Sequence, residues 1–296
     1  PPVSGQADFI RCRRRSPALH VPQDESADEI VVVEREQHVS ADEQRSLLIR
    51  WFGVWGDPTH DADNYETIQT PFEAFLFEAC YTFIAAGAEG DPIRRMLDLP
   101  YIHLIARRLQ AHRLGLFGRS PFAIPKSRKI LVSWIIHAYM VWTVLRAKSR
   151  LVALVHKDAD EGKMHIEMRT KFAIWENLPK WLKAMYTIGE AKGWFIVTHR
   201  NGVKWASHIQ PIAKGENELR QDDWTLIVFD EAAHQPLLEG AYRGGLPSVR
   251  GRGKDFGQMV LVSSVEMLSY FNTTLVNTRD LDRARLIAAG LATASV

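Results

Sequence analysis

Short apolar runs alternate with longer segments of helical periodicity through the middle of this chain. Each run is too short for a helix, so we expect strands buried on both faces, as in a parallel sheet. The runs are 120–124, 151–155, 225–229 and 259–264. The segments 133–148 and 164–186 have helical character, the second with a break near Pro179. Strands separated by helices imply right-handed crossovers and an α/β fold with a mainly parallel sheet flanked by helices.

Three further helices are expected ahead of this region. Ser40-Ala-Asp-Glu43 has the spacing of a capping box, and the next two helices span Pro71 to Ala86 and Pro100 to Leu114. Two alternating segments, Trp194 to Thr198 and Val203 to Ser207, flank Asn201-Gly202 and predict a hairpin. The remaining links are a polar turn over 157–162 and a loop rich in glycine and arginine over 244–254.

These patterns divide the chain into three parts. Residues 1–39 are rich in proline and charge and predict a partly disordered arm. Residues 40–270 form the α/β domain, in which 40–95 is the helical part, and 271–296 form a helical extension.

Composition narrows the classes of protein. The chain has 296 residues, 46% of them hydrophobic, which suffices for one large core. The formal net charge is only +2, so contact with nucleic acid must come from local patches. Two cysteines fit a reducing compartment better than a disulfide scaffold. No apolar run has the length of a membrane span, and we expect a soluble, intracellular protein.

Two acidic residues, Asp230 and Glu231, follow directly on the run 225–229. Open α/β sheets place their ligands at the carboxyl ends of the strands. Two adjacent acids there suit a Walker B pair, in which the first holds Mg²⁺ through water and the second polarises an attacking water. The alternative interpretation is a solvated acidic turn after an ordinary strand.

A basic turn joins the strand 120–124 to the helix that begins at Ser133. Strand, turn and helix together have the layout of a phosphate-binding loop, with Ser133 where the Mg²⁺-binding hydroxyl belongs. The usual G-x-x-x-x-G-K-[ST] string is absent, because no glycine lies in 125–133 and Val132 occupies the lysine position. Lys126 opens the loop and can fold back across it. Otherwise the turn is simply a solvated basic connection.

Read in order, these motifs resemble the large terminase subunits, the DNA-packaging motors of tailed bacteriophages. The resemblance rests on four features: Lys126-Ser-Arg-Lys-Ile-Leu-Val-Ser133 with the following Trp134, the hairpin at Asn201-Gly202, Leu226-Ile-Val-Phe-Asp-Glu231, and Val262-Ser-Ser264. It covers about residues 95–270.

The resemblance implies a P-loop ATPase domain of the type with an additional strand and a catalytic glutamate. ATP and Mg²⁺ are the implied ligands, with Asp230 ordering the water shell of the metal and Glu231 activating the attacking water. The implied nucleotide-binding residues are Lys126, Ser127, Arg128, Lys129 and Ser133, the last also binding the metal. Ser263 and Ser264 would couple hydrolysis to movement.

Family members work with other molecules, and the resemblance extends to these. The implied partners are double-stranded DNA, a portal protein, a small terminase subunit and further copies of the chain in a pentameric ring. No membrane is involved. The implied location is the cytoplasm of an infected host cell, at the portal of a procapsid. Complete large terminases resemble an ATPase followed by a nuclease, and we expect no nuclease activity from these residues.

Basic residues outside the phosphate loop offer two further sites. Arg250, Arg252 and Lys254 lie in the glycine-rich loop, where they would track DNA phosphates or simply be solvated. Arg220 precedes the strand of Asp230, and related packaging ATPases carry an arginine there that enters the neighbouring subunit's site. The alternative for Arg220 is a local pair with Asp222 or Asp223.

Two other functions compete with the packaging motor. Asp230-Glu-Ala-Ala-His234 is one insertion from the Asp-Glu-Ala-His box, which favours a helicase-like DNA translocase. The glycine-free loop favours instead a degenerate ATP-binding module with a role in assembly.

Overall fold

A computed structural model of the chain describes residues 39–53, 69–83, 93–115, 121–127, 131–189, 191, 193–200, 206–213, 216–249, 257–264 and 269–271. The contacts between residues separate 1–39 from 40–296, and every element below belongs to the second unit. Of the predicted arm (1–39) and the predicted extension (271–296), all but residues 39 and 271 lie outside the described residues.

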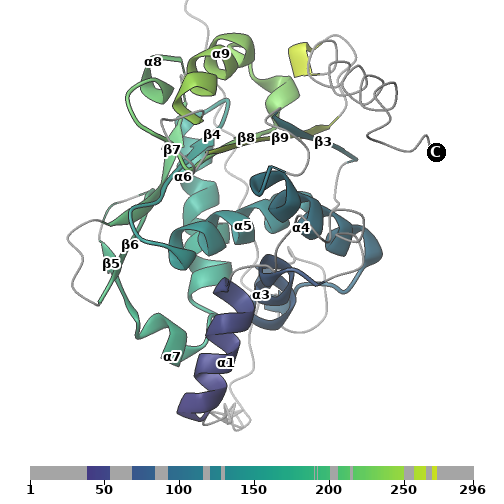
Figure 1. Ribbon diagram of the computed structural model, residues 1–296. Helices are drawn as coiled ribbons and strands as arrows, with labels where there is room; N and C mark the ends of the chain where they lie inside the picture. Colours follow the sequence, from purple (N-terminus) through teal and green to yellow (C-terminus); the bar gives the residue numbers. More distant parts are fainter. Residues whose placement is uncertain are drawn as a thin grey trace, which may run out of the picture. The chain divides into compact units, whose positions relative to one another are not determined.

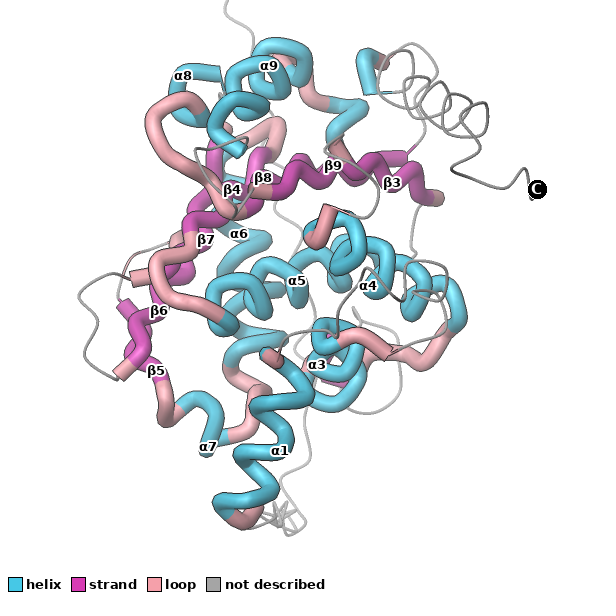
Figure 2. Tube along the Cα trace, in the orientation of Figure 1, coloured by secondary structure: helices cyan, strands magenta, loops and turns pink. Residues whose placement is uncertain are grey.

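The unit is built on a sheet of seven strands, which forms one continuous band in Figures 1 and 2. In spatial order the strands are β3 (Phe122–Lys126), β9 (Gln258–Ser264), β8 (Leu226–Asp230), β4 (Leu151–Val155), β7 (Ser207–Ile212), β6 (Phe195–His199) and β5 (Tyr186–Gly189). Neighbours from β3 to β7 pair in parallel, whereas β6 is antiparallel to both β7 and β5. The predicted mainly parallel sheet is therefore confirmed. Strands β6 and β7 are antiparallel, as in a hairpin, but β7 begins at Ser207, where the predicted second strand ends, and the predicted turn at Asn201-Gly202 lies outside the described residues.

One strand separates the two strands that carry the predicted motifs. Strand β9 lies between β3, which ends at Lys126, and β8, which ends at Asp230. An additional strand between these two is the arrangement expected for the predicted fold class.

Helices cover both faces of the sheet, as Figure 1 shows. The helices are α1 (Ala41–Phe52), α3 (Pro71–Ala79), α4 (Pro100–Arg113), α5 (Val132–Arg146), α6 (Ala159–His165), α7 (Lys180–Lys183), α8 (Glu216–Leu219) and α9 (Leu238–Val249). Helices α3, α4 and α5 pack on one face, where they bury alternate strand residues such as Val152 and Val228. Helix α9 packs on the other face over Ile227 and Met259.

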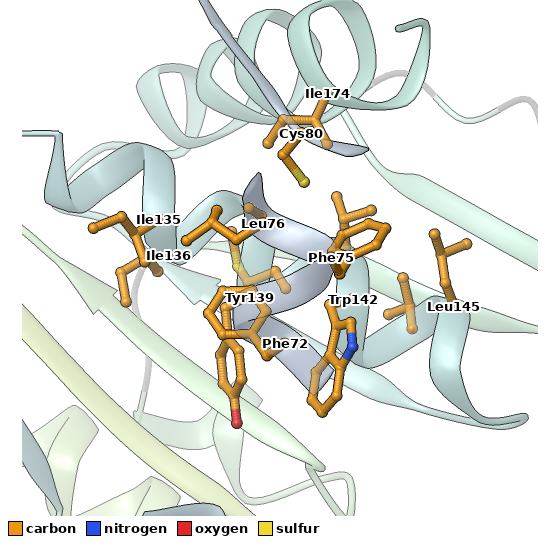
Figure 3. Close-up of a cluster of buried hydrophobic side chains, with 14 of the residues drawn as sticks. Phe72, Phe75, Leu76, Cys80, Ile135, Ile136, Tyr139, Trp142, Leu145 and Ile174 are labelled. Carbon is orange, nitrogen blue, oxygen red and sulfur yellow. The ribbon is translucent and has the colours of Figure 1, made fainter. Parts of the chain in front are cut away.

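Helix α5 is the centre of the larger core. Its residues are buried almost all round, because the sheet lies on one side and α3 and α4 on the other. Figure 3 shows the aromatic part of this packing, in which Phe72 of α3 lies 4.7 Å from Tyr139 and 5.6 Å from Trp142 between ring centroids. The phenol of Tyr139 and the indole of Trp142 also donate hydrogen bonds, to Gln258 Oε1 and the Trp51 carbonyl.

Four local predictions are wrong in part. The helix from Pro71 ends at Ala79, because Cys80 is extended and β1 (Tyr81–Phe83) pairs with β2 (Ile93–Arg95). The turn 157–162 is helical from Ala159, since the Asp158 carboxylate accepts two backbone N–H groups and caps α6. The helical segment that follows is a π-helix over Ile166–Trp175, and the break near Pro179 precedes α7. Residues 186–189 form strand β5 because they pair with β6.

The glycine-rich segment also differs from its prediction. Residues 244–249 belong to α9 and are not a loop. A Cβ added at Gly245 would lie 2.9 Å from Ile227 Cδ1 and 3.2 Å from Met259 Cε, so glycine lets the helix approach the sheet closely. Among the described residues, no helix is long and apolar enough to cross a membrane.

The core packing predicts how one substitution affects stability. Phe72→Ala should lower the free energy of unfolding by about 3–5 kcal/mol, because it removes a buried ring that packs on both Tyr139 and Trp142. Urea denaturation followed by circular dichroism measures the change. Ile49→Ala on α1, where the side chain is 64% exposed, is the matched control and should change stability by less than about 0.5 kcal/mol. Equal losses in both variants would contradict this account of the core.

Candidate nucleotide-binding site

The candidate site lies at the edge of the sheet where its parallel strands end. In the register of β3, Lys126 pairs with Ser264 of β9, and Asp230 of β8 pairs with Val262. Because β3, β9 and β8 run in the same direction, their last residues come to one edge of the sheet. The topology thus brings Lys126, Asp230, Ser263 and Ser264 to one place.

Lys126, Ser133 and Asp230 are in direct contact. The Lys126 ammonium donates a hydrogen bond to Ser133 Oγ at 2.8 Å and lies 3.8 Å from Asp230 Oδ1. Ser133 Oγ in turn donates to Asp230 Oδ1 at 3.3 Å. Ser133 is in the first turn of α5, so Lys126 at the end of β3 reaches the start of this helix. A basic side chain, a hydroxyl and a carboxylate therefore meet at the start of a helix.

The second oxygen of Asp230 faces a different set of groups. Arg169 NH1 lies 3.4 Å from Asp230 Oδ2, and the guanidinium stacks over the Trp134 ring with 5.7 Å to its centroid. The Asp230 side chain is only 4% exposed, so this cation compensates a buried charge. Burial lowers the pKa of Arg169, and the charges of Asp230 and Glu231 oppose that shift.

Arg169 is a residue that the sequence did not single out. It lies inside the π-helix Ile166–Trp175, in a segment with no motif. Its place beside Asp230 is set by the packing of that helix on α5, which no local pattern records. Its position in a π-helix is the structural feature that draws attention to Arg169, because π-helical turns are frequent at functional sites.

Glu231 leaves the strand in an unusual backbone conformation. Its φ of 53° and ψ of 41° are left-handed, and its N–H donates to Asp230 Oδ1 at 3.0 Å. The Glu231 side chain is 41% exposed and lies 3.8 Å from the Lys157 ammonium. The turn thus separates the two acids: one carboxylate is buried among cations, and the other reaches the solvent side of the edge.

The two serines at the end of β9 hold the segment that follows Glu231. Ser263 Oγ accepts a hydrogen bond from the Ala233 N–H at 2.9 Å, and Ser264 Oγ lies 3.0 Å from His234 Nε2. These two contacts join residues 233 and 234 to the end of β9. His234 has a local hydrogen-bonding partner here.

Three histidines gather behind Asp230. His165, at the end of α6, has its Nδ1 4.0 Å from Asp230 Oδ2, and its ring centroid lies 6.2 Å from that of His137 and 5.0 Å from that of His156. Burial and the positive charge of Arg169 together lower the pKa of His165 to about 4, although the charge of Asp230 opposes the shift. Burial also holds the pKa of His137 well below its ordinary value, with the same arginine contributing. Both imidazoles are therefore neutral near pH 7.

The other predicted site residues are elsewhere or are not described. Ser127 is exposed at the end of β3. Arg220 is exposed between α8 and β8, at the amino end of the strand that Asp230 ends, so it is remote from the Asp230 edge of its own chain. Arg128, Lys129, Arg250, Arg252 and Lys254 lie outside the described residues.

The groups at this edge suit a nucleotide and a magnesium ion. Ser133 Oγ and Asp230 Oδ1, 3.3 Å apart, are the hydroxyl and carboxylate oxygens that Mg²⁺ prefers. Two cations, Lys126 and Arg169, surround one buried carboxylate, so additional negative charge such as phosphate is favoured next to them. The donors present therefore fit a metal–phosphate ligand.

Comparisons with known proteins were made by sequence and by structure. No protein-family model and no curated protein matches the sequence. Among solved structures, the large terminase of bacteriophage HK97 is similar at a TM-score of 0.50 and 12% identity, over 72% of this chain and 41% of that one.

Two other solved structures are similar at lower TM-scores. The ATPase domain of the Thermus phage P74-26 large terminase has a TM-score of 0.40 and 16% identity over 52% of this chain and 62% of that one. A large terminase from a thermophilic bacteriophage, in complex with ADP, has a TM-score of 0.38 and 11% identity, covering 55% of this chain and 38% of that one. This chain thus spans less than two thirds of each. It shares its fold with part of the HK97 bacteriophage large terminase.

Proposed function

We propose that the chain is the ATP-hydrolysing motor of viral DNA packaging, the ATPase portion of a large terminase subunit. The observation that carries the proposal is the contact of Lys126, Ser133 and Asp230 at the carboxyl edge of a sheet in which β9 separates β3 from β8. The fold shared with part of the HK97 bacteriophage large terminase supports the proposal.

Nucleotide binding begins with the exchange of contacts at Lys126. The Lys126 ammonium leaves Ser133 Oγ and contacts the β- and γ-phosphates, which replace the weak ion pair with Asp230 by stronger charge-assisted bonds. Ser133 Oγ, and Asp230 Oδ1 through water, would hold Mg²⁺, which would supply charge neutralisation at the phosphates. Arg169, held between the other Asp230 oxygen and Trp134, adds a second positive charge near the site.

Hydrolysis requires a base that reaches the attacking water. Glu231 fits this role because its left-handed turn separates its carboxylate from that of Asp230. Loss of the γ-phosphate changes the surroundings of Glu231, and the bonds from Ala233 and His234 to Ser263 and Ser264 carry that change to β9. In this proposal the movement drives double-stranded DNA past the chain, with Arg250, Arg252 and Lys254 tracking phosphates.

The assembly in which the motor works is also part of the proposal. A ring of copies, proposed to be pentameric, docks on the portal protein of a procapsid in the host cytoplasm, with a small terminase subunit as a further partner. The two competing functions give different results in one assay. ATP turnover stimulated by double-stranded DNA fits the motor, whereas absence of turnover fits a degenerate ATP-binding module. A helicase-like translocase would separate strands while it hydrolyses ATP.

The first prediction concerns which lysine binds phosphate. Lys126→Ala should abolish binding of a fluorescent ATP analogue, because Lys126 is the lysine that reaches Ser133. Lys129→Ala, the matched control with the same charge change in the same loop, should retain most of the binding. Titration of both variants by fluorescence anisotropy measures this. Equal losses in the two, or intact binding in Lys126→Ala, would sink the assignment.

The second prediction concerns the catalytic base. Glu231→Gln should bind ATP as the unaltered chain does but hydrolyse it at least about 100-fold more slowly, with or without double-stranded DNA. Phosphate release measures turnover. Glu239→Gln is the control, because Glu239 is a half-exposed carboxylate on α9 that pairs with Arg243 away from the site. Turnover near the normal rate in Glu231→Gln would assign the base to another residue.

The third prediction concerns Arg220, which we propose enters the site of a neighbouring subunit. Arg220→Ala should bind ATP but hydrolyse it poorly. Mixing it with inactive Lys126→Ala should restore part of the activity, because a mixed ring pairs an intact loop with an intact arginine. An arginine finger can contribute about 10³–10⁵ in rate, so recovery is measurable. If preparations shown to assemble do not recover on mixing, Arg220 is structural.

A further inference from the structure

The buried histidines behind Asp230 have ring nitrogens without hydrogen-bond partners in the described structure. These are His137 Nε2, His156 Nε2 and His165 Nδ1. His137 and His156 are each only 1% exposed. Buried polar atoms in native proteins nearly always have a partner, so three such nitrogens within one cluster require an explanation.

Two of these histidines and Asp230 have the spacing of metal ligands. One ring nitrogen each of His137 and His165 and one carboxylate oxygen of Asp230 lie within 4.8 Å of one another. The 4.0 Å between His165 Nδ1 and Asp230 Oδ2 is too long for a hydrogen bond. Ligands of a tetrahedral Zn²⁺, each at about 2.0–2.1 Å, are separated by about 3.3 Å. Small side-chain movements would therefore close the three atoms around one ion.

The orientation of His137 is already fixed. Its Nδ1 lies 2.9 Å from Thr170 Oγ1, on the π-helix. When Nδ1–H donates to that hydroxyl, Nε2 carries the lone pair that can bind a metal. Metal-binding histidines commonly have their other ring nitrogen held by such a partner.

The two oxygens of Asp230 separate this set of groups from the proposed nucleotide site. Oδ1 accepts from Ser133 and the Glu231 N–H, whereas Oδ2 faces His165 and Arg169. Ser133 and His137 are one turn apart on α5. A cation at Oδ2 would lie one turn deeper than one at Ser133, among imidazole nitrogens that Mg²⁺ does not favour.

Two cations of the protein, Arg169 and Lys126, oppose this binding, and Arg169 is the closer to the proposed site. Arg169 lies 3.4 Å from the same Oδ2 and would have to move toward Trp134, over which it already stacks. The positive charge of Arg169 therefore sets how tightly a metal ion binds. Metal affinity at this site should therefore depend on the charge at residue 169, which a cluster of exposed surface histidines would not show.

From this geometry we propose that His137, His165 and Asp230 bind one divalent transition-metal cation of the Zn²⁺ or Co²⁺ class. The site goes beyond the proposed ATPase function, because it forms without nucleotide. The ion would join α5, the end of α6 and the end of β8, three elements that meet at Asp230.

The test uses the full chain without nucleotide, in buffer that contains Mg²⁺ to occupy sites made of oxygen alone. Calorimetric titration with Zn²⁺ should give one ion per chain. Co²⁺ should give visible absorption bands with the intensity of a four- or five-coordinate nitrogen–oxygen site.

Four variants then assign the ligands. His165→Asn and His137→Asn should each weaken Zn²⁺ binding more than about tenfold, the lower bound for loss of even an outer partner. Arg169→Gln should strengthen it, because the competing charge is removed. His208→Asn, a half-buried histidine on β7 that packs on Trp194, is the control and should bind as the unaltered chain does. If His137→Asn fails to fold, His165→Asn and Arg169→Gln decide the result.

Three outcomes would overturn the proposal: no stoichiometric Zn²⁺ binding by the unaltered chain, unchanged binding in a folded His165→Asn, or weaker binding in Arg169→Gln. Failure here is distinguishable from failure of the ATPase proposal. Lys126→Ala should lose ATP binding but retain Zn²⁺ binding. Zn²⁺ binding is therefore tested in a variant that does not bind ATP.

Discussion

Compensation of the buried Asp230 charge is the constraint on which this site depends. A carboxylate that is 4% exposed is unfavourable in a protein interior unless donors and cations surround it. Lys126, Ser133 and Arg169 come from β3, α5 and the π-helix to meet this requirement, and the Glu231 N–H completes the set. Contacts with the Asp230 carboxylate therefore link segments that are far apart in the sequence.

The rigid frame that brings these donors together is α5 between the sheet and α3. Because α5 is buried on all sides, its orientation is fixed, and so is the direction of the Ser133 side chain in its first turn. The β9 strand has an equally direct effect, because its place between β3 and β8 sets the separation of Lys126 and Asp230 across the sheet. Packing of aromatic rings along α5 is thus linked to the geometry of the edge where Lys126, Ser133 and Asp230 meet.

Much of this arrangement could be predicted from the sequence, because strongly apolar runs record burial directly. The strand before Asp230 is predictable from the short length of its apolar run and from its β-branched residues. The contact of Lys126 with Ser133 is consistent with the position of Lys126 seven residues earlier, at the start of the loop. Arg169 and the histidines could not be predicted, since their meeting depends on how the π-helix packs on α5. Strand β5 was missed for a similar reason: Tyr186-Thr-Ile-Gly189 is stabilised by pairing with β6, which a local pattern does not contain. The glycine-rich sequence predicts a loop at Gly245, whereas in the structure the absence of a side chain there lets α9 pack closely on Ile227.

The left-handed backbone at Glu231 has a consequence for the balance between stability and activity. A residue with a Cβ costs roughly 1–2 kcal/mol in that conformation, and glycine adopts it without penalty. Judged by folding alone, glycine would therefore be the better residue at this turn. Glutamate at this turn goes against the local preference of the backbone, and residues with such strained backbones are frequent at functional sites. In the proposed function this position supplies the catalytic carboxylate. The most stable form of this fold and its most active form would then differ at a single residue.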